Sequence, residues 1–229
     1  MKWEYDRAEV IADGIVHALG VAFGLAALPI LMLQVCHARI TAALIYGTGL
    51  LTVLCLSAVY NLWPISPTKW VLRRFDHAAI YLLIASTYTP FLTHLADEAA
   101  SNLLAGVWLA ASAGMILKLA CPARFERLAI PLYLGLGWSG LILPGPAAAG
   151  LPSTAVWLLA VGGVLYSAGV IFYLWETLRF HSAVWHAFAR SSGVPLLRRV
   201  LAPGLTPCSY SSSRYAGSQG HWRPVSSTR

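Results

Sequence analysis

The sequence predicts an all-α integral membrane protein, a seven-helix bundle with a cytoplasmic amino terminus. Of its 229 residues, 58% are hydrophobic and only 11% are charged, and the mean hydropathy is +0.65. A soluble domain carries roughly a quarter charged residues. The apolar residues gather in runs of about 20, which is the length that crosses a bilayer as a helix. These observations exclude a soluble enzyme, a secreted disulfide scaffold and a disordered protein.

Six apolar runs of spanning length can be delimited along the chain. The expected spans are residues 14–36, 40–63, 77–95, 102–119, 128–143 and 154–175. A seventh helix is expected to begin near Phe180 and to break off at Ala189, where the apolar pattern ends. Residues 1–189 therefore form one predicted transmembrane bundle, whose last helix is truncated and leaves one side open.

The basic residues fix the predicted orientation. Arg39 is the single basic residue in the loops of one side, whereas nine lie on the other side: Lys2, Arg7, Lys69, Arg73, Arg74, Lys118, Arg124, Arg127 and Arg179. Cytoplasmic loops of membrane proteins carry an excess of Lys and Arg. The net charge of +7 therefore reflects topology, and we expect membrane lipids rather than nucleic acid as partners.

Asp76 and His77 stand at the start of the third expected span. An ionisable residue in a span usually faces the bundle interior or a water-filled cavity, and it marks a functional site. The alternative is an interfacial N-cap, in which the Asp76 carboxylate accepts hydrogen bonds from backbone N–H groups. Position alone leaves both interpretations open.

Polar residues also lie inside the first and second expected spans. Ser57 and Asn61 are four residues apart and share one helix face, either in a functional site or as a pair that bonds across the bundle. His17 follows Asp13 by four residues, and we expect it to face the interior.

The start of the seventh segment holds two histidines. Ser182 and His186 are four residues apart and face the same way. His181 and His186 are five apart, about 140° around an ideal helix, which suits a shared metal poorly. Interfacial side chains are the alternative to metal ligands.

Several segments share a family pattern that covers residues 9 to about 188. They are Glu9–His17, Ser57–Asn61, Arg73–Phe91, Gly162–Tyr173 and Ala183–Phe188. Together they resemble the hemolysin III family, the bacterial branch of the progestin and adipoQ receptor (adiponectin receptor-like) membrane proteins, and the stretch from Asp76 to Pro90 is the most specific part. The resemblance implies a multi-pass protein of the bacterial inner (plasma) membrane with a role in membrane and lipid homeostasis. A zinc-dependent hydrolase acting on a lipid amide and a cytolytic pore are the alternatives.

The resemblance also implies a zinc site near the cytoplasmic ends of the second, third and seventh spans. In the family, a Ser-x-x-x-His on the second helix and a His-x-x-x-His on the seventh supply three imidazoles, and an Asp on the third activates water. Ser57 and Asp76 match this pattern, so they are the catalytic candidates, with Asp76 as the base and Ser57 near the oxyanion.

The zinc ligands themselves are partly replaced in this sequence. Asn61 stands at the second-helix histidine position and Ser182 at the first seventh-helix position, whereas His186 matches and His181 is displaced by one residue. The candidate metal ligands are therefore His186, His181 and Asn61. The resemblance thus implies a degenerate zinc site and leaves catalysis open.

The carboxyl-terminal residues 190–229 differ in composition from the rest of the chain. They contain nine Ser and six Arg but no Asp, Glu or Lys, and we expect a disordered basic tail. Residues 190–200 can be back-translated into a set of codons that we chose for this test. When these codons are translated in the reading frame shifted by one base, they give the apolar sequence Val-Val-Ala-Ala-Cys-His-Tyr-Cys-Gly-Val. We therefore hypothesise a frameshift; a genuine cytoplasmic tail is the alternative, and the sequence of the gene decides between them.

Overall fold

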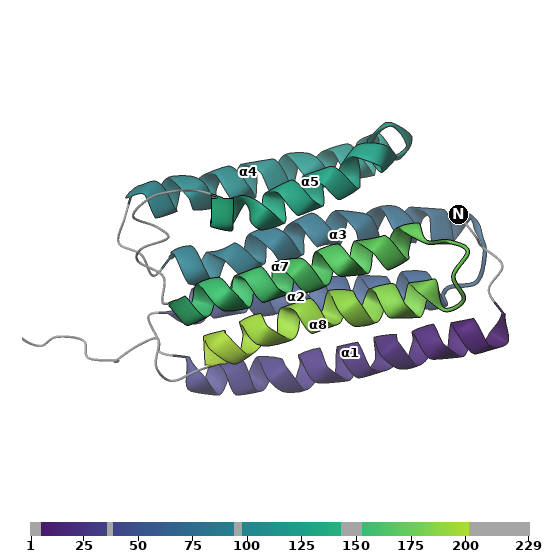
Figure 1. The fold of residues 1–229 in the computed structure, drawn as a ribbon, viewed down its shortest axis with the longest axis horizontal. Helices are drawn as coiled ribbons and strands as arrows, with labels where there is room; N and C mark the ends of the chain where they lie inside the picture. The colour runs from purple at the N-terminus through teal and green to yellow at the C-terminus, as the bar shows by residue number, and fades with distance from the viewer. Residues whose placement is uncertain (1–5, 36–38, 94–97, 143–152, 202–229) are drawn as a thin grey trace, which may run out of the picture.

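The computed structural model describes residues 6–35, 39–93, 98–142 and 153–201. Within these ranges the chain forms seven α-helices and no β-strand. They are α1 (Arg7–Gln34), α2 (Ile40–Leu62), α3 (Pro67–Leu92), α4 (Glu98–Ala120), α5 (Pro122–Ile142), α7 (Ser153–Leu174) and α8 (His181–Leu201) (Figure 1). Four of them, α1, α2, α4 and α7, contain stretches long and apolar enough to cross a membrane. The predicted all-α membrane fold is confirmed.

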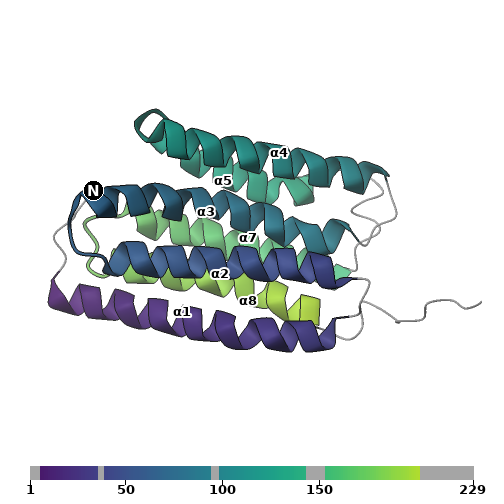
Figure 2. The ribbon, with the colours of Figure 1, turned by 180° about the vertical axis from the view of Figure 1, so that it is seen from behind.

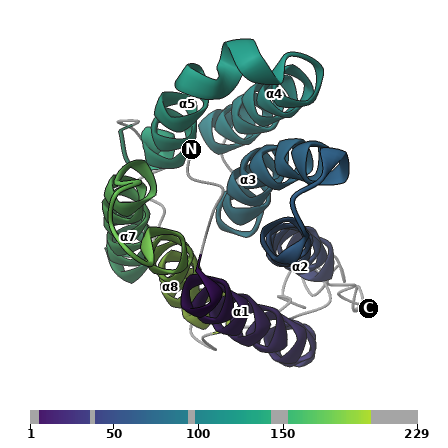
Figure 3. The same ribbon diagram turned by 90° about the vertical axis from the view of Figure 1, so that its right-hand side faces the viewer.

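The helices form a ring in chain order. Helices that follow one another along the chain pack together, and α8 packs against α1 (Figure 3). The start of α1 and the α2–α3, α4–α5 and α7–α8 connections lie at the same end of the bundle (Figures 1 and 2). This is the end to which the sequence assigns the basic residues, so we call it the basic end.

The outer surface of the ring is apolar. Leu33, Leu109 and Trp157 are 87%, 72% and 70% exposed. Exposed apolar area costs roughly 25 cal/mol per Å² in water, but a lipid surrounding removes this penalty. Several buried residues, by contrast, are polar or charged, among them Asp13, His17 and Asp76. This distribution suits a bundle that faces lipid and keeps its polar groups inside.

Helix α3 begins earlier than the sequence predicts. Ser66 is its N-cap and accepts a hydrogen bond from the backbone N–H of Lys69, and Pro67 occupies the first turn. Proline suits this position because the first helical N–H groups have no partner in the helix. Asp76 therefore lies about 2.5 turns inside the helix, and its interpretation as an N-cap is wrong.

Helix α8 continues to Leu201, so the predicted break at Ala189 is wrong. Two polar side chains after that point bond to the backbone of the helix itself. The Ser191 hydroxyl donates to the Ala187 carbonyl oxygen (2.8 Å), and the Ser192 hydroxyl donates to the Ala189 carbonyl oxygen (2.7 Å). Serine can thereby satisfy its hydroxyl inside a helix. The ring is closed by α8 against α1, and the expected disordered tail applies at most to residues 202–229, which lie outside the described residues.

Aromatic side chains join α3, α4 and α5. The Tyr88 hydroxyl donates to the Gly137 carbonyl oxygen (2.9 Å) and accepts from the Gly140 N–H (2.8 Å). Trp108 Nε1 donates to the Thr89 hydroxyl (3.1 Å). Each aromatic thus combines apolar packing with a satisfied polar atom, as buried Tyr and Trp generally require. These contacts hold α3 in place, and α3 carries residues of both polar regions described below.

Candidate functional site

A cluster of ionisable side chains lies inside the ring, where α1 meets α8. Asp13 and His17 are one turn apart on α1, and His186 and Arg190 are one turn apart on α8. Residues four apart on a helix share one face, so each helix presents a pair to the other. His17 is 0% exposed, and Asp13 and His186 are each 8% exposed. The cluster is therefore shielded from solvent and lipid.

Three members of the cluster converge on one point. His186 Nδ1 lies 2.8 Å from Asp13 Oδ1, and His17 Nε2 lies 3.6 Å from Asp13 Oδ2. The two imidazole ring centroids are 4.4 Å apart. One ligand atom from each of Asp13, His17 and His186 lies within 4.8 Å of the others. Two imidazoles and one carboxylate are a donor set used for Zn²⁺ and other divalent transition metals.

The two predicted catalytic residues lie beside this group. Asp76 and Ser57 are 7% and 8% exposed, and the Ser57 hydroxyl lies close enough to the Asp76 carboxylate to interact with it. His186 and Arg190 are close enough to Asp76 to act on its charge. The structure therefore brings Ser57, Asp76 and His186 together from α2, α3 and α8.

The other two predicted metal ligands have different surroundings. Asn61 Nδ2 donates to the Ser57 carbonyl oxygen (2.9 Å) and lies 3.4 Å from the Ser57 hydroxyl oxygen. The Asn61 amide is thus bound to its own helix, not across the bundle. His181 is buried at the first position of α8. Among the described residues, the convergent group contains His186 but not His181.

The sequence prediction did not include Asp13 and His17 among the metal ligands. The signal was present, because an Asp-x-x-x-His pair inside an apolar span places a carboxylate and an imidazole on one helix face. Their partner His186 is about 170 residues away along the chain. Only the contact between α1 and α8 identifies the three residues as one group.

Arg190 adds a positive charge to the cluster. Its Nη2 is hydrogen-bonded to His17 Nδ1, and its Nε and Nη1 are buried without a hydrogen-bond partner among the described residues. The side chain lies over Gly20, where an added Cβ would stand 2.3 Å from Arg190 Nε. Glycine at this position therefore makes room for the guanidinium.

The donor set fits a divalent metal in kind and spacing, but Arg190 opposes metal binding in two ways. It places a cation beside the group, and it sets the tautomer of His17. Arginine can only donate hydrogen bonds, so His17 Nδ1 accepts, and the neutral ring then carries its proton on Nε2. That is the atom that faces Asp13, and a metal needs a lone pair there.

The turn before α8 is fastened to the start of α1. Arg179 Nη2 lies 3.0 Å from Asp6 Oδ2, and the Phe180 N–H donates to Glu9 Oε1 (3.3 Å). The Glu9 backbone N–H and the Arg179 guanidinium hold the pKa of Asp6 below its usual value. Phe180 has φ 62°, in the left-handed region. These contacts set the position of α8 along α1, and so bring His186 opposite Asp13.

Comparison with known proteins shows the family of the chain. The family model described as Haemolysin-III related matches residues 8–191, a range that includes the whole cluster. The match ends close to the point where the Ser- and Arg-rich composition begins.

Three relatives illustrate the similarity. The Hemolysin-3 homolog of Bacillus subtilis (strain 168) is 36% identical over 198 residues, which cover 84% of this chain and 93% of the relative. Hemolysin-3 of Bacillus cereus is 35% identical over 185 residues, covering 79% and 84%. The human Monocyte to macrophage differentiation factor is 30% identical over 165 residues, covering 69% and 67%. The chain therefore belongs to the hemolysin III family.

Proposed function

We propose that this protein is a multi-pass plasma-membrane protein that acts in membrane lipid homeostasis through a divalent-metal group formed by Asp13, His17 and His186. Zinc is the first metal to test. The observation that carries the proposal is the convergence of these three buried side chains inside an apolar bundle. Arg190 weakens this metal site. Its guanidinium is hydrogen-bonded to His17, so a bound metal would lie next to a positive charge.

The location of the cluster supports a functional role. Ionisable residues inside membrane helices are costly, and those that persist usually mark a binding or reaction site. Here Asp13 and Asp76 supply two carboxylates, while Arg190 supplies one guanidinium. The carboxylates thus exceed the fixed cation by one charge, which favours a further cation at the cluster.

A hydrolase is the form of this function that the Ser57–Asp76 pair favours. A zinc ion in the group would supply Lewis acidity toward a carbonyl oxygen or water. Asp76 would accept a proton at its carboxylate, and the neighbouring Ser57 hydroxyl would help to orient it. A lipid amide is the proposed substrate, because the family resemblance implies one.

The decisive experiment measures zinc in the full-length protein purified in detergent. Arg190→Met removes the guanidinium but keeps an apolar stem, and we expect it to bind zinc about tenfold more tightly than the unmodified chain, which corresponds to about 1.4 kcal/mol. Adding His186→Ala to Arg190→Met should abolish binding. Arg124→Met is the matched control, because Arg124 is exposed on α5, away from the cluster. Equal zinc binding by the two single variants would show that Arg190 does not oppose the metal, whereas zinc binding that survives the addition of His186→Ala would refute the metal group.

Hydrolysis is tested separately with a long-chain ceramide in mixed micelles. We expect fatty-acid release by zinc-loaded Arg190→Met, and loss of that release when Asp76→Asn is added. Zinc binding without any release would retain the metal group and reject the hydrolase.

A pore is the second candidate, and the name of the Bacillus cereus relative, Hemolysin-3, favours it. The test is release of a trapped dye from vesicles that contain the purified protein. Release that rises with protein density would support a pore, whereas retention of the dye would reject it.

A further inference from the structure

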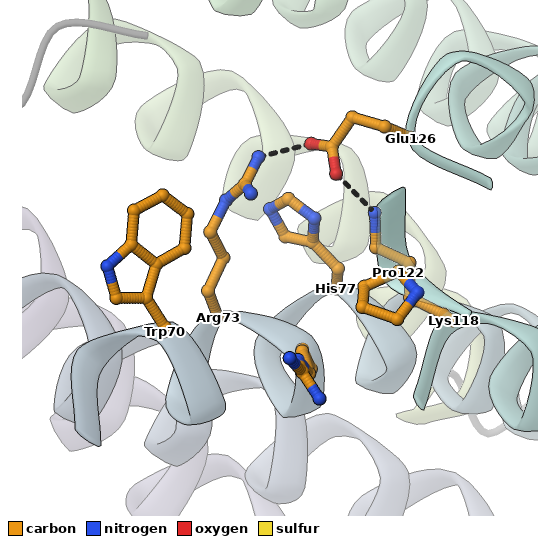
Figure 4. Close-up of a pocket in the computed structure, with 7 residues that line it drawn as sticks. Trp70, Arg73, His77, Lys118, Pro122 and Glu126 are labelled. Atoms are coloured by element: carbon orange, nitrogen blue, oxygen red, sulfur yellow. Dashed lines mark hydrogen bonds and ion pairs between the residues drawn. The ribbon is translucent and has the colours of Figure 1, made fainter. Parts of the chain in front are cut away.

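A second polar site lies at the basic end of the bundle, on a different face of α3 from Asp76. A cavity of about 220 Å³ opens there between α3, α4 and α5 (Figure 4). Its polar and aromatic lining comes from Trp70, Arg73, Arg74, His77, Lys118 and Glu126. We call it the basic cavity.

The charges of the basic cavity do not balance. Glu126 binds two cations, Arg73 through one carboxylate oxygen and Lys118 Nζ through the other at 3.3 Å (Figure 4). The Lys118 side chain is 3% exposed and that of Arg73 is 14% exposed. Arg74 adds a third cation. The cavity therefore holds one carboxylate against two buried cations and one exposed cation, and buried charge without a full counter-ion is costly.

Other acidic groups nearby do not remove this excess. Asp76 is close enough to Arg73 to interact with its charge, but the carboxylate also lies near Ser57, His186 and Arg190. Arg73 Nε is buried and has no hydrogen-bond partner in the described part of the chain. The cavity thus contains both an excess of positive charge and an unsatisfied donor.

Its edge suits the membrane surface. Trp70 is 51% exposed, and Arg73 lies over its ring at 5.9 Å from the centroid. Tryptophan is enriched at the level of the lipid headgroups. Arginine and lysine at the end of a bundle are the side chains that bind phosphate through charge-assisted hydrogen bonds.

We propose that the basic cavity binds a phosphate group, carried by an anionic phospholipid headgroup or present as free phosphate. Basic pockets between transmembrane helices on the cytoplasmic side suit anionic headgroups. The cavity is smaller than the roughly 300–1,000 Å³ that enclose a drug-sized ligand. It therefore encloses the phosphate and leaves the rest of a lipid outside, along the apolar surface of the bundle.

The test uses the full chain in a neutral detergent and measures binding of dioleoylphosphatidylglycerol by titration calorimetry, with dioleoylphosphatidylcholine and inorganic phosphate as further probes. Arg74→Gln removes one exposed cation of the cavity, and we expect about three- to fivefold weaker binding. Arg124→Gln is the matched control, because it removes the same charge from an exposed residue at the same end, outside the cavity lining. Glu126→Gln removes the competing carboxylate and should tighten binding about tenfold.

The opposite signs of these two effects separate a binding site from a structural ion network. Equal weakening by Arg74→Gln and Arg124→Gln would show general attraction to the basic end and overturn the proposal. Weaker binding by a folded Glu126→Gln variant would overturn it as well. Free phosphate would be identified as the ligand if millimolar inorganic phosphate competes and the protein does not prefer phosphatidylglycerol over phosphatidylcholine. Preference for phosphatidylglycerol would identify the lipid as the ligand.

Discussion

Two polar regions meet at α3, and they differ in how their charges are compensated. In the cluster between α1 and α8, the carboxylate of Asp13 lies between two imidazoles, and Arg190 supplies a cation from within the chain. In the basic cavity, Lys118 and Arg73 share the single carboxylate of Glu126. In the first region, Arg190 balances one of the two carboxylates, Asp13 and Asp76, from within the chain, so internal substitutions should dominate its behaviour. The second has an excess of one sign, so it should respond to an external anion.

Removal of the central carboxylate should have the largest effect. Asp13→Ala leaves His186 without its hydrogen-bond partner, and it removes the carboxylate that lies beside His17 and Arg190. Breaking a buried, hydrogen-bonded charge pair typically costs about 3–5 kcal/mol, and we expect a loss of this size in the free energy of unfolding. The measurement is denaturant unfolding in detergent followed by circular dichroism.

Glu98→Ala is the control for this loss, because Glu98 is exposed in the first turn of α4. Exposed substitutions of this kind usually change stability by less than about 0.5 kcal/mol. Similar losses for both variants would show that the cluster does not stabilise the contact between α1 and α8. Binding of phosphatidylglycerol to the folded fraction should stay unchanged, since the basic cavity lies on another face of α3.

The sequence predicted the fold more completely than the site. Apolar runs and the bias of basic residues located the helices and the basic end, because both signals are local in the chain. The start of α3 was placed too late because Lys69, Arg73 and Arg74 interrupt the apolar pattern. These three residues nevertheless belong to the helix. The end of α8 was placed too early because serines that bond to their own helix look like a loop in sequence.

The site depends on contacts between distant segments, which spacing alone does not reveal. Ser57 and Asp76 were identified from a family pattern, and the structure places them beside His186. Asp13 and His17 were overlooked because the expected ligands lay on the second and seventh helices. Arg190 belongs to the stretch that we expected to be disordered, yet its side chain is in contact with His17.

A small substitution next to Arg190 should sharpen the distinction between the two regions. An alanine Cβ at Gly20 would lie 2.3 Å from Arg190 Nε and 2.6 Å from its Cδ. The flexible guanidinium can move away, so we expect Gly20→Ala to fold, to free His17 Nδ1 and to tighten zinc binding about tenfold, about 1.4 kcal/mol. Isothermal titration with zinc measures the change.

Gly106→Ala is the matched control, because an added Cβ there meets nothing within 4 Å. It should leave zinc affinity unchanged and stabilise α4 slightly, since alanine favours helices over glycine. Unchanged zinc affinity in a folded Gly20→Ala variant would show that Arg190 does not compete with a metal.

A third variant tests the packing between α3 and α5. Tyr88→Phe removes the hydroxyl that joins α3 to Gly137 and Gly140 on α5. We expect a loss of about 1 kcal/mol in the free energy of unfolding, the usual net value of a buried hydrogen bond. Zinc affinity should not change, because these contacts lie on the side of α3 away from α1 and α8.

Tyr46→Phe provides the comparison for that variant. Tyr46 is 2% exposed and packs with Ala27, Leu31 and Ala43 in a separate core cluster. Tyr46→Phe should cost less than Tyr88→Phe, because it keeps the ring and its packing and removes no hydrogen bond that joins two helices. An equal loss in both variants would attribute the effect to ring packing and not to the bonds from Tyr88.

The smallest expected effect concerns the link between the start of α1 and the turn before α8, which aligns the cluster but does not touch the basic cavity. The pKa of Asp6 is lowered in the folded protein by the Glu9 backbone N–H and by Arg179. Its stabilising contribution is therefore fully present above the unfolded pKa, about 3.9, and is lost as the pH falls through the lower folded value. Hydrogen exchange of the first turn of α1, corrected for intrinsic rates, should accelerate below about pH 4. Asp6→Asn keeps the N-cap but has no carboxylate to titrate, so hydrogen exchange in this variant should not accelerate below about pH 4. An equal acceleration in both proteins would show that another acidic group causes it.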